Sequence, residues 1–185
     1  MNFSATAIHG CKKIELQKNE DSRGYFARAW CADEFQEAGL PGHIVQCSLS
    51  YNREAGTLRG MHFQLPPSKE GKIVRCVRGA ILDAVVDLRS YEDSHMVSVT
   101  IRLDDSQGTA LYIPPGCAHG FQTLEDDTEV LYMMTDVYQP ELSRGFRWDD
   151  PVFSIDWPIP SPIIHQRDAE YADFGDSATD SMEWL

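Results

Sequence analysis

The sequence predicts an all-β fold with a few short helices. Three observations support this prediction: short runs of alternating apolar and polar residues, turn residues at intervals of about ten residues, and little helical periodicity. Alternation with a period of two is expected of strands that bury one face, and evenly spaced turns are typical of a sandwich or barrel.

The clearest predicted strand covers residues 96–103. Four apolar side chains would share its buried face: Val97, Val99, Ile101 and Leu103. Residues 73–77 and 81–88 are two further β-rich runs, joined by a predicted turn at Arg78 and Gly79.

The remaining predicted elements are two strands and one helix. Residues 110–113 and 129–135 are strand candidates, and Tyr132 lies in the second of them. Residues 31–38 form the best short helix, which Gly39 ends.

The chain has the size and composition of one domain. It contains 185 residues, of which 42% are hydrophobic and 24% charged, as expected of a globular protein. We therefore expect a single domain over residues 1–185. Residues 168–185 contain six acidic residues and no basic one, so residues 169–185 are predicted to be a solvated, partly disordered acidic tail.

Charge and cysteine usage exclude several classes of protein. Acidic residues outnumber basic ones by 29 to 16, and a net charge of −13 argues against nucleic acid or an anionic membrane as a partner. The chain shows no signal peptide and no apolar run long enough to span a membrane. Its five scattered cysteines predict reduced thiols, and together these features predict a cytoplasmic protein.

Two segments carry residues that could perform chemistry. The first contains Gly56, His62, Gln64, Lys72 and Gly79, and the second contains Gly108, Pro114, Gly116 and His119. Their spacing resembles the two sequence motifs of the cupin superfamily. This resemblance implies a double-stranded β-helix, or jelly roll.

The departures from the metal-binding form of these motifs are informative. That form has a second histidine where this chain has Gln64, and a glutamate where this chain has Lys72. A divalent metal needs several converging nitrogen or oxygen ligands, and an ammonium group would repel it. We therefore predict a pocket without a metal that contains His62, His119 and Lys72.

These residue types suit proton transfer beside a ketone. His62 could remove a proton from carbon, because imidazole titrates near neutrality. Lys72 could hold the oxygen of the resulting enolate. Tyr132, on a neighbouring predicted strand, could return a proton to the opposite face and so invert the carbon.

Several sequence blocks resemble the dTDP-4-dehydrorhamnose 3,5-epimerase family, in order along most of the chain. They are residues 21–26, 56–64, 71–75, 87–89, 113–121, 131–132, 138–140 and 148–151. One such block would be weak support, but so many in the same order are a specific signal.

The resemblance implies roles for five residues in the reaction. His62 matches the catalytic base, Asp168 the carboxylate that orients it, and Tyr132 the proton donor. Lys72 and His119 match the groups around the 4-keto oxygen and the sugar. The implied activity is epimerisation of a nucleotide-linked 4-keto-6-deoxyhexose at C3, C5 or both.

Six further residues match contacts to the nucleotide-sugar substrate. They are Arg23 and Arg59 at the diphosphate, Phe26, Tyr138 and Gln46 at the nucleoside, and Arg167 at a position that is often basic in the family. Forked guanidinium groups suit a diphosphate, and aromatic rings suit a base.

The resemblance also implies a homodimer whose N-terminal strands cross between subunits. Exposed sheet edges give a physical reason for such pairing. No organic cofactor is expected, because the ketone itself accepts the electrons, and the sequence shows no Gly-rich dinucleotide loop.

Some residues depart from the common family pattern or lack a role in it. Arg28, Cys47, Ser48 and Ser143 replace residues at nucleotide and outer sugar contacts, so the sugar, the nucleotide and the inverted carbon stay open. Three histidines, His43, His95 and His165, are interpreted as surface residues.

Three other functions remain possible from the sequence. One is a single-centre epimerase or ketoisomerase that acts on a related nucleotide ketosugar. Another is a metal-dependent cupin oxygenase or isomerase, against which Gln64 and Lys72 argue. The last is a non-catalytic cupin that binds sugar nucleotides, against which His62 and Tyr132 argue.

Overall fold

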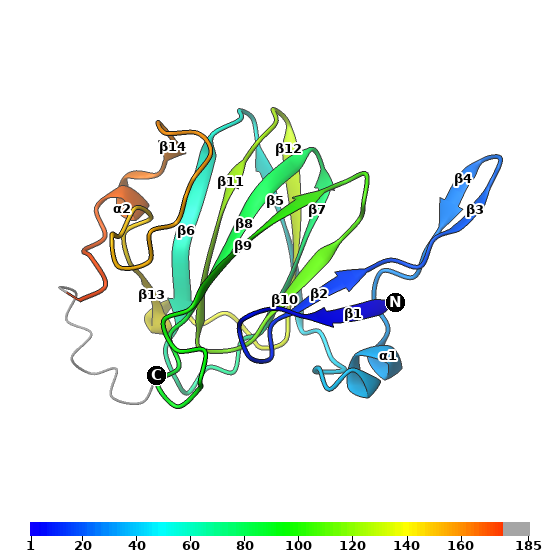
Figure 1. Cartoon of the computed structure of the whole chain (residues 1–185), viewed down its shortest axis with the longest axis horizontal. Coiled ribbons are helices and arrows are strands. Elements are labelled where there is room, and N and C mark those ends of the chain that lie inside the picture. The colour runs from blue at the N-terminus through cyan, green and yellow to red at the C-terminus, as the bar shows by residue number, and fades with distance from the viewer. Residues whose placement is uncertain (176–185) are drawn as a thin grey trace.

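Two facing β-sheets form the body of the protein in a computed structural model that describes residues 1–175 (Figure 1). The first sheet has the strand order β1 (Asn2–Ala5), β2 (Lys12–Glu15), β10 (Ala110–Ile113), β7 (Lys72–Arg78), β12 (Thr128–Met134) and β5 (Gln46–Asn52). The second has the order β13 (Ser143–Gly145), β6 (Thr57–Gln64), β11 (Cys117–Thr123), β8 (Ala80–Asp87) and β9 (Ser98–Asp104).

The remaining elements are short. β14 (Ile163–Ile164) pairs with β6 in parallel, and β3 (Asn19–Asp21) and β4 (Gly24–Phe26) form a separate hairpin. The helices are α1 (Ala32–Glu37), α2 (Gln166–Ala169) and a 3₁₀ turn, η1 (Pro140–Leu142). The predicted all-β fold with a few short helices is therefore confirmed. No helix within residues 1–175 is long and apolar enough to cross a membrane.

The main core lies between the two sheets. Fully buried side chains from the first sheet (Val74, Leu111 and Val130) meet fully buried ones from the second (Val85, Leu103 and Phe121). Burial of this apolar surface is the main force that holds the sheets together.

The predicted strands agree closely with the observed ones. Residues 110–113 match β10, and residues 129–135 match β12 with a shift of one residue. β9 begins only at Ser98, because Met96 has a positive φ of 64° and lies in the preceding loop. The alternating face predicted for 96–103 packs against the main core.

The turn at Arg78 and Gly79 is a corner between the sheets. Gly79 has a φ of +77°, which suits a glycine, and its backbone lies close to Thr128. β7 belongs to the first sheet and β8 to the second, so this turn closes the sandwich at one end.

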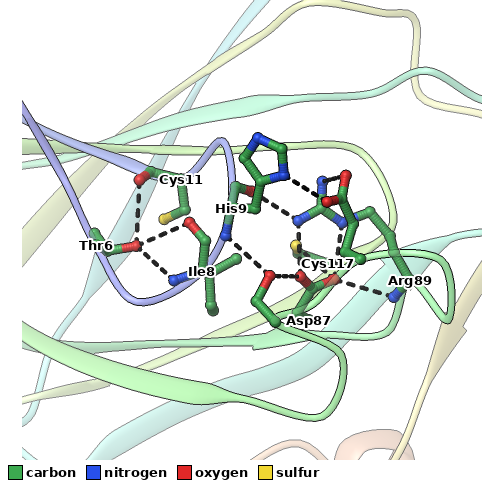
Figure 2. A network of polar contacts seen from close by, with 9 residues as sticks. Thr6, Ile8, His9, Cys11, Asp87, Arg89 and Cys117 are labelled. Atoms are coloured by element: carbon green, nitrogen blue, oxygen red, sulfur yellow. Dashed lines mark hydrogen bonds and ion pairs between the residues drawn. The ribbon is translucent and has the colours of Figure 1, made fainter.

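A buried polar network connects the loop between β1 and β2 to the loop after β8 (Figure 2). Arg89 donates to both carboxylate oxygens of Asp87 and to the carbonyl oxygen of His9. Ser94 donates to Asp87 and accepts the amide hydrogen of His9. Burial raises the pKa of the neighbouring Cys11 thiol to about 12, and all five cysteines are free, as predicted.

The start of the predicted acidic tail is partly solvated and partly packed. Ala169, Glu170, Ala172 and Gly175 are exposed, whereas the ring of Phe174 packs against those of Phe146 and Phe153. The amide of Phe174 donates to the buried carboxylate of Asp150. Phe174 therefore anchors this segment to the body of the protein, and the rest of the predicted tail, residues 176–185, lies outside the described residues.

Candidate active site

A cavity of about 730 Å³ opens on strands of both sheets and on α2. Seven predicted site residues line it: Arg59, His62, Lys72, His119, Tyr132, Arg167 and Asp168. An adjoining cavity of about 350 Å³ shares His62, Lys72, Tyr132 and Arg167 with it and adds Gln46 and Tyr138. The structure thus brings nine of the eleven predicted residues together.

His62 and Asp168 form a bonded pair. Nε2 of His62, on β6, lies 2.9 Å from Oδ1 of Asp168, on α2. The other carboxylate oxygen accepts the amide hydrogen of Gly60 at 3.3 Å. Gly60 has a φ of +131°, and a Cβ there would lie 2.5 Å from the Cα of Gly120 on the next strand, so only glycine fits.

The surroundings of this pair favour a neutral imidazole beside a carboxylate. Burial opposes ionisation of Asp168, but hydrogen bonds from His62, Arg167 and the Gly60 amide outweigh it and lower the pKa of Asp168 to about 2. Burial lowers the pKa of His62, and the charges of Arg167 and Lys72 add to that effect, while Asp168 opposes it. A neutral histidine at neutral pH can accept a proton.

A second histidine and carboxylate pair lies on the adjacent strands. Nε2 of His119, on β11, is 2.6 Å from Oδ1 of Asp83, on β8, and both side chains are buried. Oδ2 of Asp83 has no hydrogen-bond partner within residues 1–175. The sequence prediction missed Asp83, although an acidic residue inside the apolar run 81–88 was a signal for it.

Tyr132 lies across the cavity on the first sheet. Its ring meets that of His119 edge to face, with centroids 5.9 Å apart and an interplanar angle of 75°. Burial raises the pKa of Tyr132 far above its usual value, and the charge of Asp83 adds to this effect. The phenol therefore keeps its proton until a strong base, such as an enolate, takes it.

Lys72 is the first residue of β7, and a carboxylate lies next to its ammonium group. Its Nζ is 3.3 Å from Oε1 of Glu70, whose side chain is buried. The sequence prediction also missed Glu70. Within residues 1–175, no group of three or more His, Cys, Asp or Glu side chains is placed to hold a metal ion.

Two arginines bring positive charge to the cavity. Arg59 is exposed, and its Nε donates to Oδ1 of the buried Asn52 at 2.8 Å. Arg167 donates from Nε to Asp168 at 3.0 Å, and its Nη2 is 3.2 Å from Nε2 of His62. Both can reach an anion that enters the cavity.

The adjoining cavity holds the predicted nucleoside contacts. The backbone amide of Tyr138 donates to Oε1 of Gln46 at 2.7 Å, which ties the residue after β12 to the start of β5. The Tyr138 ring is half exposed and free to stack.

Arg23 and Phe26 lie elsewhere. Both belong to the β3–β4 hairpin, which projects from the body of the protein (Figure 1). Arg23 pairs with Asp21, and the Phe26 side chain is 78% exposed. Neither lines the cavity of its own chain, so their contact with the substrate stays a prediction.

Two more residues, one beside His62 and one lining the cavity, were not predicted to belong to the site. Tyr171 meets the ring of His62 at a centroid distance of 6.0 Å, from within the supposed tail. His165 is exposed, as predicted, but it also lines the cavity, and its Nδ1 accepts the amide hydrogen of Arg167.

The chain matches a known protein family. The family model described as dTDP-4-dehydrorhamnose 3,5-epimerase matches residues 5–176. A protein of that name from Sinorhizobium fredii is 38% identical over 170 residues, covering 91% of this chain and 87% of the relative. A dTDP-4-dehydrorhamnose 3-epimerase from Streptomyces niveus is 35% identical, covering 92% and 82%.

Solved structures agree with this match. The dTDP-4-dehydrorhamnose 3,5-epimerase from Elizabethkingia anophelis superimposes with a TM-score of 0.92 at 32% identity, covering 96% of this chain and 98% of that one. An epimerase from Legionella pneumophila, in complex with dTDP-4-keto-L-rhamnose, gives 0.90 at 30% identity, covering 97% and 95%. These likenesses confirm the cupin jelly roll.

Proposed function

This chain belongs to the dTDP-4-dehydrorhamnose 3,5-epimerase family of isomerases, and we propose from this premise that it epimerises a dTDP-linked 4-keto-6-deoxyhexose. Inversion takes place at C3, C5 or both, the carbons on either side of the C4 ketone. One observation carries the proposal: the His62–Asp168 pair faces Lys72 and Tyr132 across a single cavity.

His62 is the base in this reaction. Asp168 holds Nε2, and no residue in the described part of the chain bonds Nδ1, so this nitrogen is the one available to the substrate. His62 takes the proton from the carbon next to the ketone, and the electron pair of the broken C–H bond forms the enolate. The buried carboxylate orients the ring and stabilises the imidazolium that results.

Lys72 and His119 stabilise the enolate. The ammonium group of Lys72 faces the developing negative charge, and His119 is fixed beside it by Asp83. A preorganised donor in a partly buried cavity lowers the energy of the charged transition state more than of the neutral ketone.

Tyr132 returns a proton to the opposite face. It comes from β12 in the first sheet, whereas His62 comes from β6 in the second, so the two side chains approach the sugar from opposite sheets. The enolate takes the phenolic proton, and the carbon is inverted. Because the phenol pKa is raised by burial, Tyr132 is protonated throughout the neutral range.

The nucleotide occupies the rest of the two cavities. Arg59 and Arg167 bind the diphosphate, whose charge they match, and Gln46 and Tyr138 contact the base. A chain of net charge −13 can bind an anionic substrate here because three positive side chains, Arg59, Lys72 and Arg167, line the cavities.

The hairpin completes the site of a second subunit in a homodimer. Tyr25 and Phe26 are 49% and 78% exposed on its second strand, β4, and Leu49 and Tyr51 are 59% and 46% exposed on the edge strand β5. Exposed apolar side chains on a projecting hairpin and a sheet edge suit pairing with a second copy. Arg23 and Phe26 then reach the partner's nucleotide, and the assembled enzyme works in the cytoplasm.

A single-centre epimerase is the second candidate. The Streptomyces niveus relative carries the name of a 3-epimerase at nearly the same identity as the 3,5-epimerases. A non-catalytic binding protein is less well supported, because the residues of the proposed proton-transfer set line one cavity. A ketoisomerase is less well supported, because the relatives carry the names of epimerases.

Product analysis tests the proposal. The enzyme is incubated with dTDP-4-keto-6-deoxyglucose, the products are reduced with borohydride, and the released sugars are identified by chromatography. Inversion at both carbons identifies a 3,5-epimerase, and inversion at one identifies a single-centre enzyme. Unchanged sugar would contradict the proposed activity on this substrate.

A further inference from the structure

Glu70 is a buried carboxylate that lies behind Lys72. Its side chain is 4% exposed, that of Lys72 is 17% exposed, and Oε1 lies 3.3 Å from Nζ. The other oxygen, Oε2, accepts a hydrogen bond from Nε2 of Gln64 at 3.2 Å. Because Gln64 holds one oxygen, the carboxylate presents the other to the ammonium group.

Gln64 is itself held in place. Its Oε1 accepts the amide hydrogen of Gln139 at 3.3 Å, so its amide group must point Nε2 toward Glu70. A chain of contacts therefore runs from the backbone after β12 through Gln64 and Glu70 to Lys72. A network in which each member has a partner is rigid.

The backbone between the two charged residues is also fixed. The amide of Glu70 donates to Oγ of Ser68, and that of Gly71 donates to Oγ1 of Thr135 at 2.8 Å. A Cβ at Gly71 would lie 2.8 Å from the hydroxyl of Tyr112, so glycine allows this close approach. The segment thus sets Glu70 and Lys72 on the same side of the chain.

Glu70 is the only carboxylate within ion-pair distance of Lys72 in the described part of the chain. The site therefore contains three matched pairs, in which a buried carboxylate supports a group that faces the cavity. The other two are Asp168 with His62 and Asp83 with His119.

We propose that Glu70 is a positioning residue that holds the ammonium group of Lys72 where the enolate oxygen develops. A lysine has a flexible four-carbon stem, and without a partner its charge would be spread over many positions. Fixing it in advance lowers the cost of reorganisation during the reaction. This inference rests on the proposed function, because it assumes that Lys72 meets the enolate.

The variant Glu70→Gln tests this role without changing the shape of the side chain. We expect kcat to fall by about 10- to 100-fold, because a misplaced group loses much of its transition-state stabilisation. The Kd for dTDP alone should change by less than about twofold, since the lost interaction acts on the enolate and not on bound nucleotide.

Glu15→Gln is a matched control. Glu15 pairs with Lys13, and the two residues are separated by the same number of positions as Glu70 and Lys72. This pair lies on the surface, outside both cavities. The control makes the same change in net charge, and kcat should stay at the wild-type value. Thermal unfolding of both variants checks that the fold is retained.

A double-mutant cycle with Lys72→Met distinguishes positioning from direct contact. If Glu70 acts through Lys72, Glu70→Gln causes no further loss of kcat in the Lys72→Met background. The inference is overturned if Glu70→Gln alone keeps wild-type kcat, if it costs the same factor in both backgrounds, or if Lys72→Met has no effect.

An NMR measurement separates failure of this inference from failure of the proposed function. The ¹⁵N signal of the Lys72 ammonium, assigned by its loss in Lys72→Met, should be visible in the wild type and broadened by exchange with water in Glu70→Gln. This result needs no turnover, so it stands even if no substrate is processed. An ammonium signal that Glu70→Gln leaves unchanged would contradict the inference.

Discussion

His62 and His119 are direct partners across the adjacent strands β6 and β11. Each is bonded through Nε2 to a different buried carboxylate, Asp168 in one case and Asp83 in the other. The register of two strands thus sets both imidazoles side by side against one cavity, and the carboxylates fix the orientation of each ring. In the proposed reaction, one histidine removes a proton while the other holds the sugar.

The pair of His62 and Asp168 predicts a characteristic pH dependence. The pKa of His62 is lowered from 6.5, so in the wild type the acid limb of kcat/KM lies below pH 6.5. In Asp168→Asn the group that raises this pKa is lost, so the limb moves to still lower pH. The rate at neutral pH falls by about 100-fold or more, because the base is weaker and no longer oriented.

Rates of proton exchange measured from pH 4.5 to 9 (a range of about two pKa units on either side of histidine) check this prediction. The exposed carboxylate Asp93 offers a control in Asp93→Asn. A limb that moves to higher pH in Asp168→Asn would contradict the described role of the carboxylate.

Asp168 also contributes to stability in a defined pH window. Its pKa is lowered from 3.8 to about 2 in the folded protein. A lowered folded pKa stabilises the protein above the unfolded pKa, and this contribution disappears as the pH falls through the folded value. Asp168→Asn should therefore lower the free energy of unfolding by about 2 kcal/mol at pH 7.

Urea unfolding of the wild type and Asp168→Asn at a series of pH values measures this contribution. Below about pH 4, where Asp168 itself takes up a proton, the difference should shrink as the pH falls. A difference that keeps growing below pH 4 would show that the carboxylate is not the stabilising form.

The proposed reach of the β3–β4 hairpin into a partner subunit predicts complementation between two variants that are each expected to be inactive. One is His62→Ala, and the other is the double variant Arg23→Ala, Phe26→Ala. In a mixed dimer, one site combines an intact His62 with an intact hairpin from the other subunit. Mixing, unfolding and refolding the two variants should therefore restore activity, and sedimentation should show dimers. No recovery in confirmed mixed dimers would place the hairpin residues outside the active site.

The sequence was a good guide where local pattern decides structure. Alternation in residues 96–103 predicted most of β9, because one face of this run packs against the main core. Motif spacing located His62, Lys72 and His119, which lie on three strands, β6, β7 and β11, and line the cavity.

The local sequence pattern did not predict which side chains meet in the folded protein. The pairing of Glu70 with Lys72 and of Asp83 with His119 became visible only in the folded structure. An acidic composition predicted a solvated tail, yet the ring of Tyr171 meets that of His62 and the ring of Phe174 packs against that of Phe146. Composition gives the number of charged residues in a segment, but it does not show which of its apolar side chains pack against the rest of the protein.

Tyr132→Phe separates proton removal from proton return. The variant keeps His62 and Lys72, so substrate protons should still exchange with solvent, but inversion should fall by about 100-fold or more because the donor is missing. Exchange is followed by NMR in heavy water and inversion by product analysis. Loss of exchange and inversion to the same extent would contradict the assignment of Tyr132 as the acid.

The central claim is that His62 removes a proton from carbon next to the ketone, and deuterium wash-in tests it most directly. Wild type and His62→Ala are incubated with dTDP-4-keto-6-deoxyglucose in heavy water, and the C3 and C5 protons are followed by NMR. We expect exchange at one or both carbons in the wild type and a loss of about 1,000-fold or more in His62→Ala. Wild-type exchange rates in His62→Ala would contradict the account.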